Sequence, residues 1–303
     1  MANTPQGEEI AKAMLVRIEA ALEECVLLAQ NTNGRAAPGT ISEAIRYGLF
    51  PGGGRVRPRL SLAVSMACGD PFPAASNATA CAIEMLHCAS LVHDDLPCFD
   101  DAPTRRGKPS MHVAYGQPIA LLAGDALIVM AFEAIGRACE DQPQLTAPLI
   151  RICGEAVSCP SGIIAGQAWE SEAAVPLHDY HFAKTAALFV GATMGGAAAA
   201  GADPAPWRKL GEALGSAYQV ADDLRDYAGD EAEIGKPVGQ DETNDRPNAV
   251  AIHGVEATLE LMRSHINAAV EAVPDCNGSD LLRGLIHGEA KRLVPKSLAQ
   301  FAA

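Results

Sequence analysis

Long segments of this chain carry apolar residues at three-and-four spacing or are apolar throughout, whereas alternating strand patterns are scarce. Apolar residues at that spacing share one face of a helix, which must be buried against other helices. Turn-forming residues separate the segments, so the connections are short. The pattern predicts an all-α fold, a bundle of roughly ten helices. The helical segments are Glu8 to Gln30, Arg59 to Ala67, Ala75 to His93, Ile119 to Cys139, Leu145 to Val157, Tyr180 to Gly201, Pro206 to Tyr227 and Gly254 to Ala272.

The chain has 303 residues, enough for two domains, but no linker, charge block or change in composition separates two halves. We therefore expect residues 1–303 to form a single domain. Lysine and arginine number 23 and aspartate and glutamate 37, which gives a formal net charge of −14. This acidic balance argues against nucleic acid or an anionic membrane surface as a partner.

The cysteines and the longest uncharged stretch indicate a cytoplasmic protein without a membrane span. Nine cysteines are scattered through apolar stretches and lack the spacing of metal-binding or redox motifs. Met1 to Lys12 is polar and acidic, unlike a signal peptide. The uncharged stretch from Thr185 to Ala202 is rich in alanine and glycine, whose transfer into lipid gains little. Close packing between helices in the core explains it better.

Two aspartate clusters stand at the ends of apolar helical segments that lie far apart in the sequence. The first contains Asp94, Asp95, Asp100 and Asp101, and the second is the sequence Asp-Asp-Leu-Arg-Asp at 222–226. Carboxylates on core helices are costly unless positive charge neutralises them. A shared magnesium site that faces a polyanionic substrate, such as a diphosphate, explains both clusters.

The expected helix geometry brings the first cluster together. His87 and Asp94 are seven residues apart, so they lie on one stripe of the helix, about two turns from each other. Pro97 cannot continue a regular helix, so the chain must return Asp100 and Asp101 towards Asp94 on a distorted turn.

The second cluster also presents carboxylates on one face. Asp222 and Asp226 are at i and i+4, with Tyr218 and Gln219 one turn earlier on the same face. Both clusters can therefore direct oxygens into one cavity. Magnesium prefers a few carboxylates together with waters and substrate phosphates, and sparse aspartates on rigid helices meet that preference.

Basic residues stand close to the clusters in an otherwise acidic chain. Arginines bind phosphate oxygens in pairs, and a glycine turn lets backbone N–H groups approach an anion. The combination of cations and carboxylates indicates a diphosphate site. The basic residues concerned are Arg55 and Arg57 after three glycines, Arg105, Arg106 and Lys108 after the first cluster, and Lys184 and Lys236 beside helical segments.

The aspartate clusters have two other interpretations that stay open at this point. Each aspartate cluster alone is also typical of a solvated helix end or a cap, since acidic surface runs are common. The doublet His93-Asp94 also fits an HD-type metal phosphohydrolase, but the sequence has no matching histidine pair for it. Two clusters that both follow apolar helices favour the diphosphate site.

An ordered series of motifs resembles the trans-polyprenyl diphosphate synthase family. The resemblance covers about residues 45 to 255, and within the family it is strongest to bacterial geranylgeranyl diphosphate synthases of carotenoid and bacteriochlorophyll pathways. It implies an isoprenoid-synthase type of helical bundle around a deep central cavity. The motifs are PGGGRVRP (51–58), LHCASLVHDDLPCFDDAPTRRGKPS (86–110), LAGDAL (122–127), GIIAGQAWE (162–170), KTAALF (184–189) and YQVADDLRD (218–226).

The resemblance implies a prenyltransferase that condenses isopentenyl diphosphate with an allylic diphosphate: dimethylallyl, geranyl or farnesyl diphosphate. About three magnesium ions would bind the allylic diphosphate between the two aspartate clusters, so that the carbon–oxygen bond ionises. The metal ligands implied are Asp94, Asp95, Asp100, Asp222 and Asp226, with Asp223 on the same wall.

The resemblance also assigns the substrate-binding residues. Isopentenyl diphosphate would be held by Arg57, His87 and Arg106. The allylic diphosphate would be held by Arg105, Lys184, Gln219 and Lys236. Thr185 and Gln167 would steady the carbocation and the pocket near it, and the set of candidate substrate-binding residues also includes Arg55 and Arg246.

This chain departs from the family pattern at a few positions. Gly54 stands where the family usually has a lysine, which removes one cation from the expected isopentenyl diphosphate site. Gln240 and Arg246 stand where lysines are usual, and Glu170 replaces an aspartate. All six aspartates that match the metal-binding positions remain, so we expect an active enzyme.

Product length should depend on residues beneath the first cluster. Ala89 and Ser90 lie about one turn before Asp94, and both are small. In related farnesyl diphosphate synthases an aromatic side chain occupies the position of Ala89 and blocks growth. Its absence favours a product of twenty carbons rather than fifteen.

Other functions remain as alternatives. They are a farnesyl diphosphate synthase of the same family, a terpene cyclase, which usually lacks a second aspartate-rich motif, and a non-catalytic partner subunit, which typically loses aspartates. Family members are commonly homodimers, and the apolar segment from Ile119 to Cys139 is a candidate contact surface. An internal core helix is the alternative interpretation of the same segment.

Overall fold

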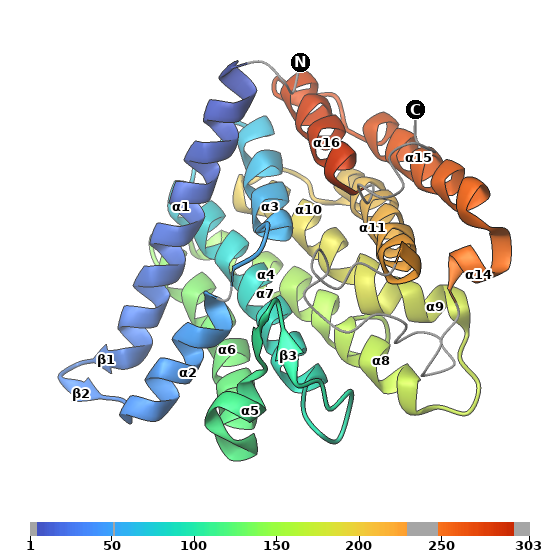
Figure 1. The fold of residues 1–303 in the computed structure, drawn as a ribbon. Coiled ribbons are helices and arrows are strands. Elements are labelled where there is room, and N and C mark those ends of the chain that lie inside the picture. The colour runs from blue at the N-terminus through green and yellow to red at the C-terminus, as the bar shows by residue number, and fades with distance from the viewer. Residues whose placement is uncertain (1–4, 51, 229–247, 294–303) are drawn as a thin grey trace.

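A computed structural model describes residues 5–50, 52–228 and 248–293 of the chain. The fold is a bundle of helices, as predicted, and its two pairs of short strands are hairpins at the edge (Figure 1). The helices are α1 (Pro5–Gln30), α2 (Gly39–Leu49), α3 (Val56–Ala67), α4 (Pro73–Asp94), α5 (Met111–Tyr115), α6 (Gln117–Ala138), α7 (Pro143–Val157), α8 (Ile163–Ala168), α9 (Leu177–His181), α10 (Ala187–Ala199), α11 (Arg208–Ala228), α14 (Ala249–His253), α15 (Val255–Glu271) and α16 (Ser279–Leu293).

Short elements connect some of these helices. The strands β1 (Asn31–Thr32) and β2 (Arg35–Ala36) form one antiparallel hairpin, and β3 (Thr104–Arg105) and β4 (Lys108–Pro109) form the other. Single turns of tighter or wider helix are η1 (Trp169–Ser171), η2 (Phe182–Ala186) and η3 (Ala205–Trp207).

Helix α4 lies at the centre and packs against α3, α6 and α10, while α1 lies along one side and α15 and α16 along the other (Figure 1). Its first residue, Pro73, has the fixed φ that suits the first turn of a helix. Most of its side chains are buried because partners surround it. The centre of the bundle therefore holds the helix that ends in the first aspartate cluster.

Helix α10 confirms the expectation that the alanine- and glycine-rich stretch packs closely in the core. Every residue from Ala187 to Ala199 is buried. A Cβ on Gly196 would lie 2.3 Å from the carbonyl oxygen of Ser61 in α3, and one on Gly211 of α11 would lie 2.5 Å from Cα of Val190. Only glycine allows these approaches.

Each long helix expected from the sequence is present, within a few residues at either end. The segment expected as one helix from Tyr180 to Gly201 is divided into α9, the wide π-helical turn η2, and α10. The sequence analysis missed α2, α5, α8, α14 and α16. All nine cysteines are free thiols, although Cys98 and Cys159 are exposed rather than in the core.

Within the described residues, two helical stretches are long and apolar enough to cross a membrane by length and composition. The stretch Leu177–Ala199 is mostly buried inside the bundle, as the core of a folded protein requires. The other is α6, the larger part of which is not buried. Its exposed part includes Leu121, Leu122 and Val129.

Candidate active site

The two aspartate clusters meet at one cleft, with an empty volume of about 1090 Å³, between the ends of α4 and α11. Carboxylates, cations and a few apolar side chains line it together. This mixture is what a pocket for a charged substrate with an apolar tail requires. The lining residues are Arg57, His87, Ser90, Leu91, Asp94, Asp100, Asp101, Ala102, Pro103, Arg105, Ile163, Gln167, Lys184, Thr185 and Asp222.

The first cluster returns on itself as predicted. Asp94 is the last residue of α4, and the backbone N–H of Asp100 donates to the carbonyl oxygen of Asp94 at 3.0 Å. The N–H of Asp101 donates to Leu96 O, and Asp101 has a positive φ of 46°. This turn brings Asp94, Asp100 and Asp101 to the cleft wall.

Asp95, the next residue along, is buried and is bound by Arg105 instead of facing the cleft. The Arg105 guanidinium donates to both carboxylate oxygens of Asp95, with Nε at 3.0 and 3.2 Å. Because the pair joins the start of the cluster to the β3–β4 hairpin, Asp95 fixes an arginine that does line the cleft.

The second cluster divides its carboxylates between two sides of α11. Asp222 lines the cleft and pairs with Arg225 at 2.6 Å. Asp223 is buried and turned away from the cleft: its oxygens accept from Gln219 Nε2 and from the backbone N–H of Ala249, both at 2.9 Å. The expected position of Asp223 on the same wall is therefore not what the structure shows, because neighbouring residues of a helix point about 100° apart.

Asp226 and Gln219 also lie outside the set of cleft-lining residues. Gln219 nevertheless touches the site, because its Oε1 accepts a hydrogen bond of 2.7 Å from Thr185 Oγ1. The amide thus links Thr185 in the cleft to Asp223 behind it.

Lys184 and Thr185 reach the cleft from the π-helical turn η2. Turns of this kind are frequent at functional sites because the extra residue re-aims side chains. Helix α8 packs directly on it: a Cβ on Gly166 would lie 2.4 Å from the backbone nitrogen of Lys184. Lys184 Nζ donates to Glu170, a pair that the sequence analysis did not foresee. Gln167 Nε2 donates to Ser90 O at 2.9 Å and to Asp94 Oδ1 at 3.2 Å.

Arg57 and His87 also line the cleft, and their side chains contact each other. Arg57 Nη1 lies 3.4 Å from His87 Nε2, and the guanidinium stacks over the Phe189 ring with its carbon 4.6 Å from the ring centre. Among the described residues, Arg57 Nε and His87 Nδ1 are buried without a hydrogen-bond partner. Buried polar atoms are seldom left unpaired, so these two indicate a place for a bound anion.

Arg106 stands at the tip of the β3–β4 hairpin with a positive φ of 53°, followed by Gly107 at 73°. Two consecutive residues of this kind make the tight turn that suits a hairpin. Its Nη1 donates to Gly52 O at 2.6 Å, so the glycine loop holds the guanidinium from the far side. Arg106 does not line the cleft itself, but its charge contributes to lowering the pKa of His87.

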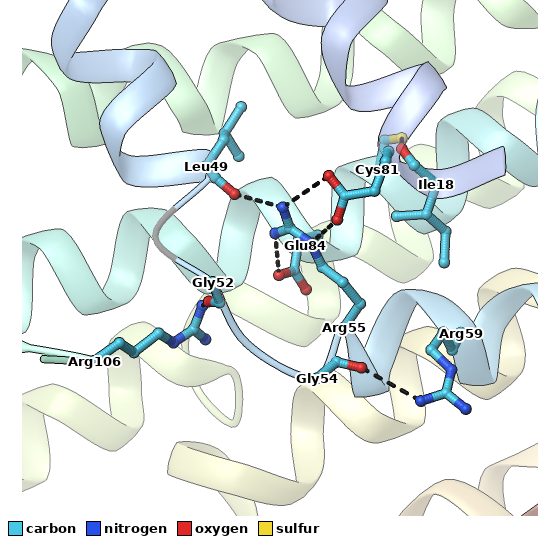
Figure 2. A network of polar contacts seen from close by, with 10 residues as sticks. Ile18, Leu49, Gly52, Gly54, Arg55, Arg59, Cys81, Glu84 and Arg106 are labelled. Carbon is cyan, nitrogen blue, oxygen red and sulfur yellow. Dashed lines mark hydrogen bonds and ion pairs between the residues drawn. The ribbon is translucent and has the colours of Figure 1, made fainter. Parts of the chain in front are cut away.

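Arg55, expected among the substrate-binding residues, is directed into the protein. It is buried between Glu19, Glu84 and the carbonyl oxygen of Leu49, and it is absent from the cleft lining (Figure 2). The reason is its left-handed backbone at the start of α3, φ 47°, which turns the side chain away from Arg57.

Burial controls the protonation of several site residues. Burial raises the pKa of Asp94, and the nearby positive charge of Lys184 only partly offsets this increase. Burial also raises the pKa of Asp95, and the hydrogen bond from Arg105 only partly offsets it. Burial, followed by the charge of Arg57, lowers the pKa of His87 well below its usual range. The cleft therefore holds a neutral imidazole at neutral pH.

The donor set fits magnesium. Asp94, Asp100 and Asp222 present carboxylate oxygens, the ligand type that magnesium prefers, in the lining of one cleft. Over the described residues, no three acidic, histidine or cysteine side chains converge into a complete protein cage for a metal. Magnesium usually keeps waters and substrate phosphates among its ligands, so an incomplete set of carboxylates suits it.

The remaining predicted residues fall into two groups. Lys236, Gln240 and Arg246 lie outside the described residues. Ser90 lines the cleft, whereas Ala89 is buried in the core beside it.

The sequence analysis missed Glu84 and Glu19, the partners of Arg55, and Phe189, the ring beneath Arg57. One signal was available for Glu84: it lies three residues before His87, on the same face of an apolar helix.

Comparisons with known proteins identify the family of this chain. The model of the family described as Polyprenyl synthetase matches residues 38–278. The chain is 49% identical to the geranylgeranyl diphosphate synthase of Cereibacter sphaeroides, over 93% of this chain and 97% of that one. It is 45% identical to the geranylgeranyl diphosphate synthase of Rhodobacter capsulatus, over 92% and 95%.

A solved structure shares the fold. The crystal structure of a geranyltransferase from Helicobacter pylori, complexed with magnesium and isoprenyl diphosphate, has a TM-score of 0.74 and 26% identity, over 92% of this chain and 98% of that one. With residues 38–278 matched and two close relatives covered almost end to end, the chain belongs to the polyprenyl synthetase family of enzymes.

Proposed function

We propose that this protein is a geranylgeranyl diphosphate synthase, which joins isopentenyl diphosphate to an allylic diphosphate. One observation carries the proposal: carboxylates from two distant helices and four cationic or histidine side chains line the same cleft. A terpene cyclase ionises a similar allylic substrate but has no second diphosphate to bind. Arg57 and His87, which contact each other in the cleft lining, provide for that second diphosphate.

The allylic diphosphate binds between the aspartate walls. Lys184 and Arg105 face its oxygens, and Lys236 and Arg246 are proposed to approach it from the part of the chain that follows α11. Asp94, Asp100 and Asp222 would hold about three magnesium ions with Asp226, as in the family, while Asp95, the remaining expected ligand, is bound by Arg105. When bound, magnesium supplies positive charge that stabilises the leaving diphosphate.

Thr185 and Gln167 stand beside the carbon that becomes cationic. Thr185 donates its hydroxyl hydrogen to Gln219, so the lone pairs of its oxygen remain directed to the cleft. A carbocation is stabilised by fixed oxygen dipoles of this kind.

Isopentenyl diphosphate binds on the side of Arg57, His87 and Arg106. The unpaired Arg57 Nε and His87 Nδ1 are available to its phosphate oxygens. Its double bond then attacks the allylic cation, and the departing diphosphate takes the proton that is lost. Holding both substrates in one cleft, with little water between them, supplies much of the rate.

We also propose that the enzyme is a cytoplasmic homodimer. Leu122 and Val129 lie two turns apart on the outer face of α6 and are 54% and 64% exposed. Exposed apolar side chains at helical spacing on one face are typical of an interface between subunits.

Product analysis tests the proposed activity. The purified protein would be incubated with magnesium, isopentenyl diphosphate and, in separate reactions, dimethylallyl, geranyl and farnesyl diphosphate. The products would be dephosphorylated and identified by mass. We expect a linear alcohol of twenty carbons with each primer. A fifteen-carbon product would indicate a farnesyl diphosphate synthase, and a lack of elongation by folded protein would contradict the proposal.

A further inference from the structure

Arg55 uses its guanidinium entirely within the protein, although it is only two residues from Arg57 in the cleft. Its side chain is 4% exposed, and Glu84 beside it is 3% exposed. Nη1 donates to Glu84 Oε1 at 2.7 Å, Nε to Glu19 Oε1 at 2.8 Å, and Nη2 to Leu49 O at 2.6 Å (Figure 2). Hydrogen bonds to both carboxylates outweigh burial, so the pKa of Arg55 is raised and the charge is permanent.

The three partners of Arg55 belong to three different helices. Glu19 is in α1, Glu84 is in α4, and Leu49 is the last residue of α2. Arg55 itself precedes α3 in the left-handed region, φ 47°, a strained conformation for a residue other than glycine. Such a conformation persists only where its surroundings hold it, and here the bonds to Glu19 and Glu84 do so.

The segment in front of Arg55 holds Arg106. Arg106 Nη1 donates to Gly52 O at 2.6 Å (Figure 2). Gly53 has a φ of 133°, and a Cβ there would lie 2.8 Å from Arg106 Nη1. The glycine loop is thus shaped around the Arg106 guanidinium, and Arg55 fixes the end of that loop.

The same pair stands next to the other two candidate ligands of isopentenyl diphosphate. Arg57 follows Arg55 by two residues in the first turn of α3. His87 follows Glu84 by three residues on one face of α4, so the carboxylate lies about one turn below the imidazole. Glu84 also opposes, through its charge, the lowering of the pKa of Arg57 by burial.

We propose that the buried Arg55–Glu84 pair is a positioning element for isopentenyl diphosphate: it sets Arg57, His87 and Arg106 relative to one another without touching substrate. This inference rests on the proposed function. A buried ion pair adds little to stability over apolar residues of the same size, so its value here lies in geometry. Asp222 and Lys184 belong to α11 and η2, and Asp94 follows Glu84 by ten residues, almost three turns along α4, so the pair does not bind them directly.

Glu84→Gln tests the inference, because it removes the charge and keeps the shape. We expect the KM for isopentenyl diphosphate to rise at least about tenfold, while the KM for the allylic primer changes less than about threefold. Arg55→Lys keeps the charge but has fewer donors, so it should give an intermediate KM. Glu23→Gln is the matched control. It breaks the exposed ion pair between Arg46 and Glu23, which joins α2 to α1 through hydrogen bonds of 2.5 and 2.6 Å. This variant should leave both KM values unchanged.

Each outcome decides the question. An unchanged KM for isopentenyl diphosphate in Glu84→Gln, with a wild-type protein that elongates, would overturn the inference and leave the proposed function intact. Equal rises in both KM values with a lower Tm would show a general structural role and would also overturn it.

Should Glu84→Gln fail to fold, the double variant Arg55→Met/Glu84→Met replaces the pair by apolar side chains. If that variant folds, it should show the selective loss, whereas failure of both to fold would assign the pair to the fold. A wild-type protein that does not elongate would instead reject the proposed function.

Discussion

At the scale of single residues, the most informative atoms are the polar ones that lack a partner. Arg57 Nε and His87 Nδ1 are buried and have no partner within the part of the chain that the structure describes. The neighbouring Arg55 has its hydrogen bonds satisfied within the protein. Sequence alone could not separate the two arginines, since both follow the same glycines. The difference arises from one backbone angle, the positive φ of Arg55.

Gly54, which stands where the family usually has a lysine, leads to a prediction at this scale. Its φ lies outside the left-handed region, and a Cβ there would be 3.3 Å from Val56 Cγ2, so a longer side chain needs only a small adjustment. We expect Gly54→Lys to lower the KM for isopentenyl diphosphate by about fivefold to tenfold, because one charged hydrogen bond is added. Steady-state kinetics would measure it, with Gly54→Met as the uncharged control. Equal KM values in the two variants would refute the prediction.

His87 gives a prediction about pH. Its pKa is lowered well below the usual value by burial and by the charges of Arg57 and Arg106. The unfolded chain therefore binds a proton at His87 that the folded protein does not bind, so stability is lost as pH falls below about 6.5. We expect His87→Asn to remove the contribution of His87 to this decrease in the free energy of unfolding. That contribution is at most about 1.4 kcal/mol per pH unit. Urea unfolding at pH 7.5 and pH 5.5 would measure it. If the free energy of unfolding of the wild type decreases between pH 7.5 and pH 5.5 by no more than that of the variant, the role of His87 is contradicted.

At the scale of elements, periodicity located the long helices, but it did not locate the short ones. Helices α5, α8 and α14 have too few turns to show a repeating apolar face, and they owe their form to the packing around them. The wide turn η2 was also beyond prediction, because the close approach of Gly166 to Lys184 is a contact between distant segments. The first aspartate turn was predictable because Pro97 cannot continue α4.

The aspartate pairs show what helix geometry adds to a motif. Adjacent residues point about 100° apart, so only one member of each pair can face the cleft squarely. Asp94 and Asp222 do so, whereas Asp95 binds Arg105 and Asp223 accepts the backbone N–H of Ala249. The carboxylates of the two adjacent pairs are therefore of two kinds, those that line the cleft and those that fix its walls.

Helix α4 also carries the prediction on product length. Ala89 is buried next to Ser90, which lines the cleft. We expect Ala89→Tyr to shift the main product from twenty to fifteen carbons, because the added ring occupies the path of the growing chain. Overpacking should lower stability by about 1–3 kcal/mol, so Tm would be measured beside the products. Ala89→Ser, with little added volume, is the control. An unchanged product from folded Ala89→Tyr would show that other residues limit the chain.

At the scale of the whole molecule, the bundle buries α4 and α10 and leaves one side of α6 exposed. The sequence analysis predicted both the single bundle and the contact role of α6, since that helix is apolar all round. It could not distinguish an internal helix from a surface one, because composition alone does not show which neighbours a helix finds.

Helix α6 predicts the oligomeric state. We expect the double variant Leu122→Glu/Val129→Glu to convert a dimer into a monomer, because two charges would have to be buried in the interface. Light scattering after size exclusion would give the mass. Leu27→Glu, an equally exposed leucine on α1, serves as control and should remain dimeric. A wild-type monomer, or a variant dimer of unchanged affinity, would rule out this surface.

The central claim is that two distant aspartates act on one substrate through magnesium. The most direct measurement compares elongation rates of Asp94→Asn and Asp222→Asn over a range of magnesium concentrations. Asp179→Asn, an exposed aspartate outside the cleft, is the control. We predict that each cleft variant loses about 100-fold or more in kcat and needs more magnesium, while the control matches the wild type. If either cleft variant elongates at the wild-type rate with the wild-type magnesium requirement, the two clusters do not form one site.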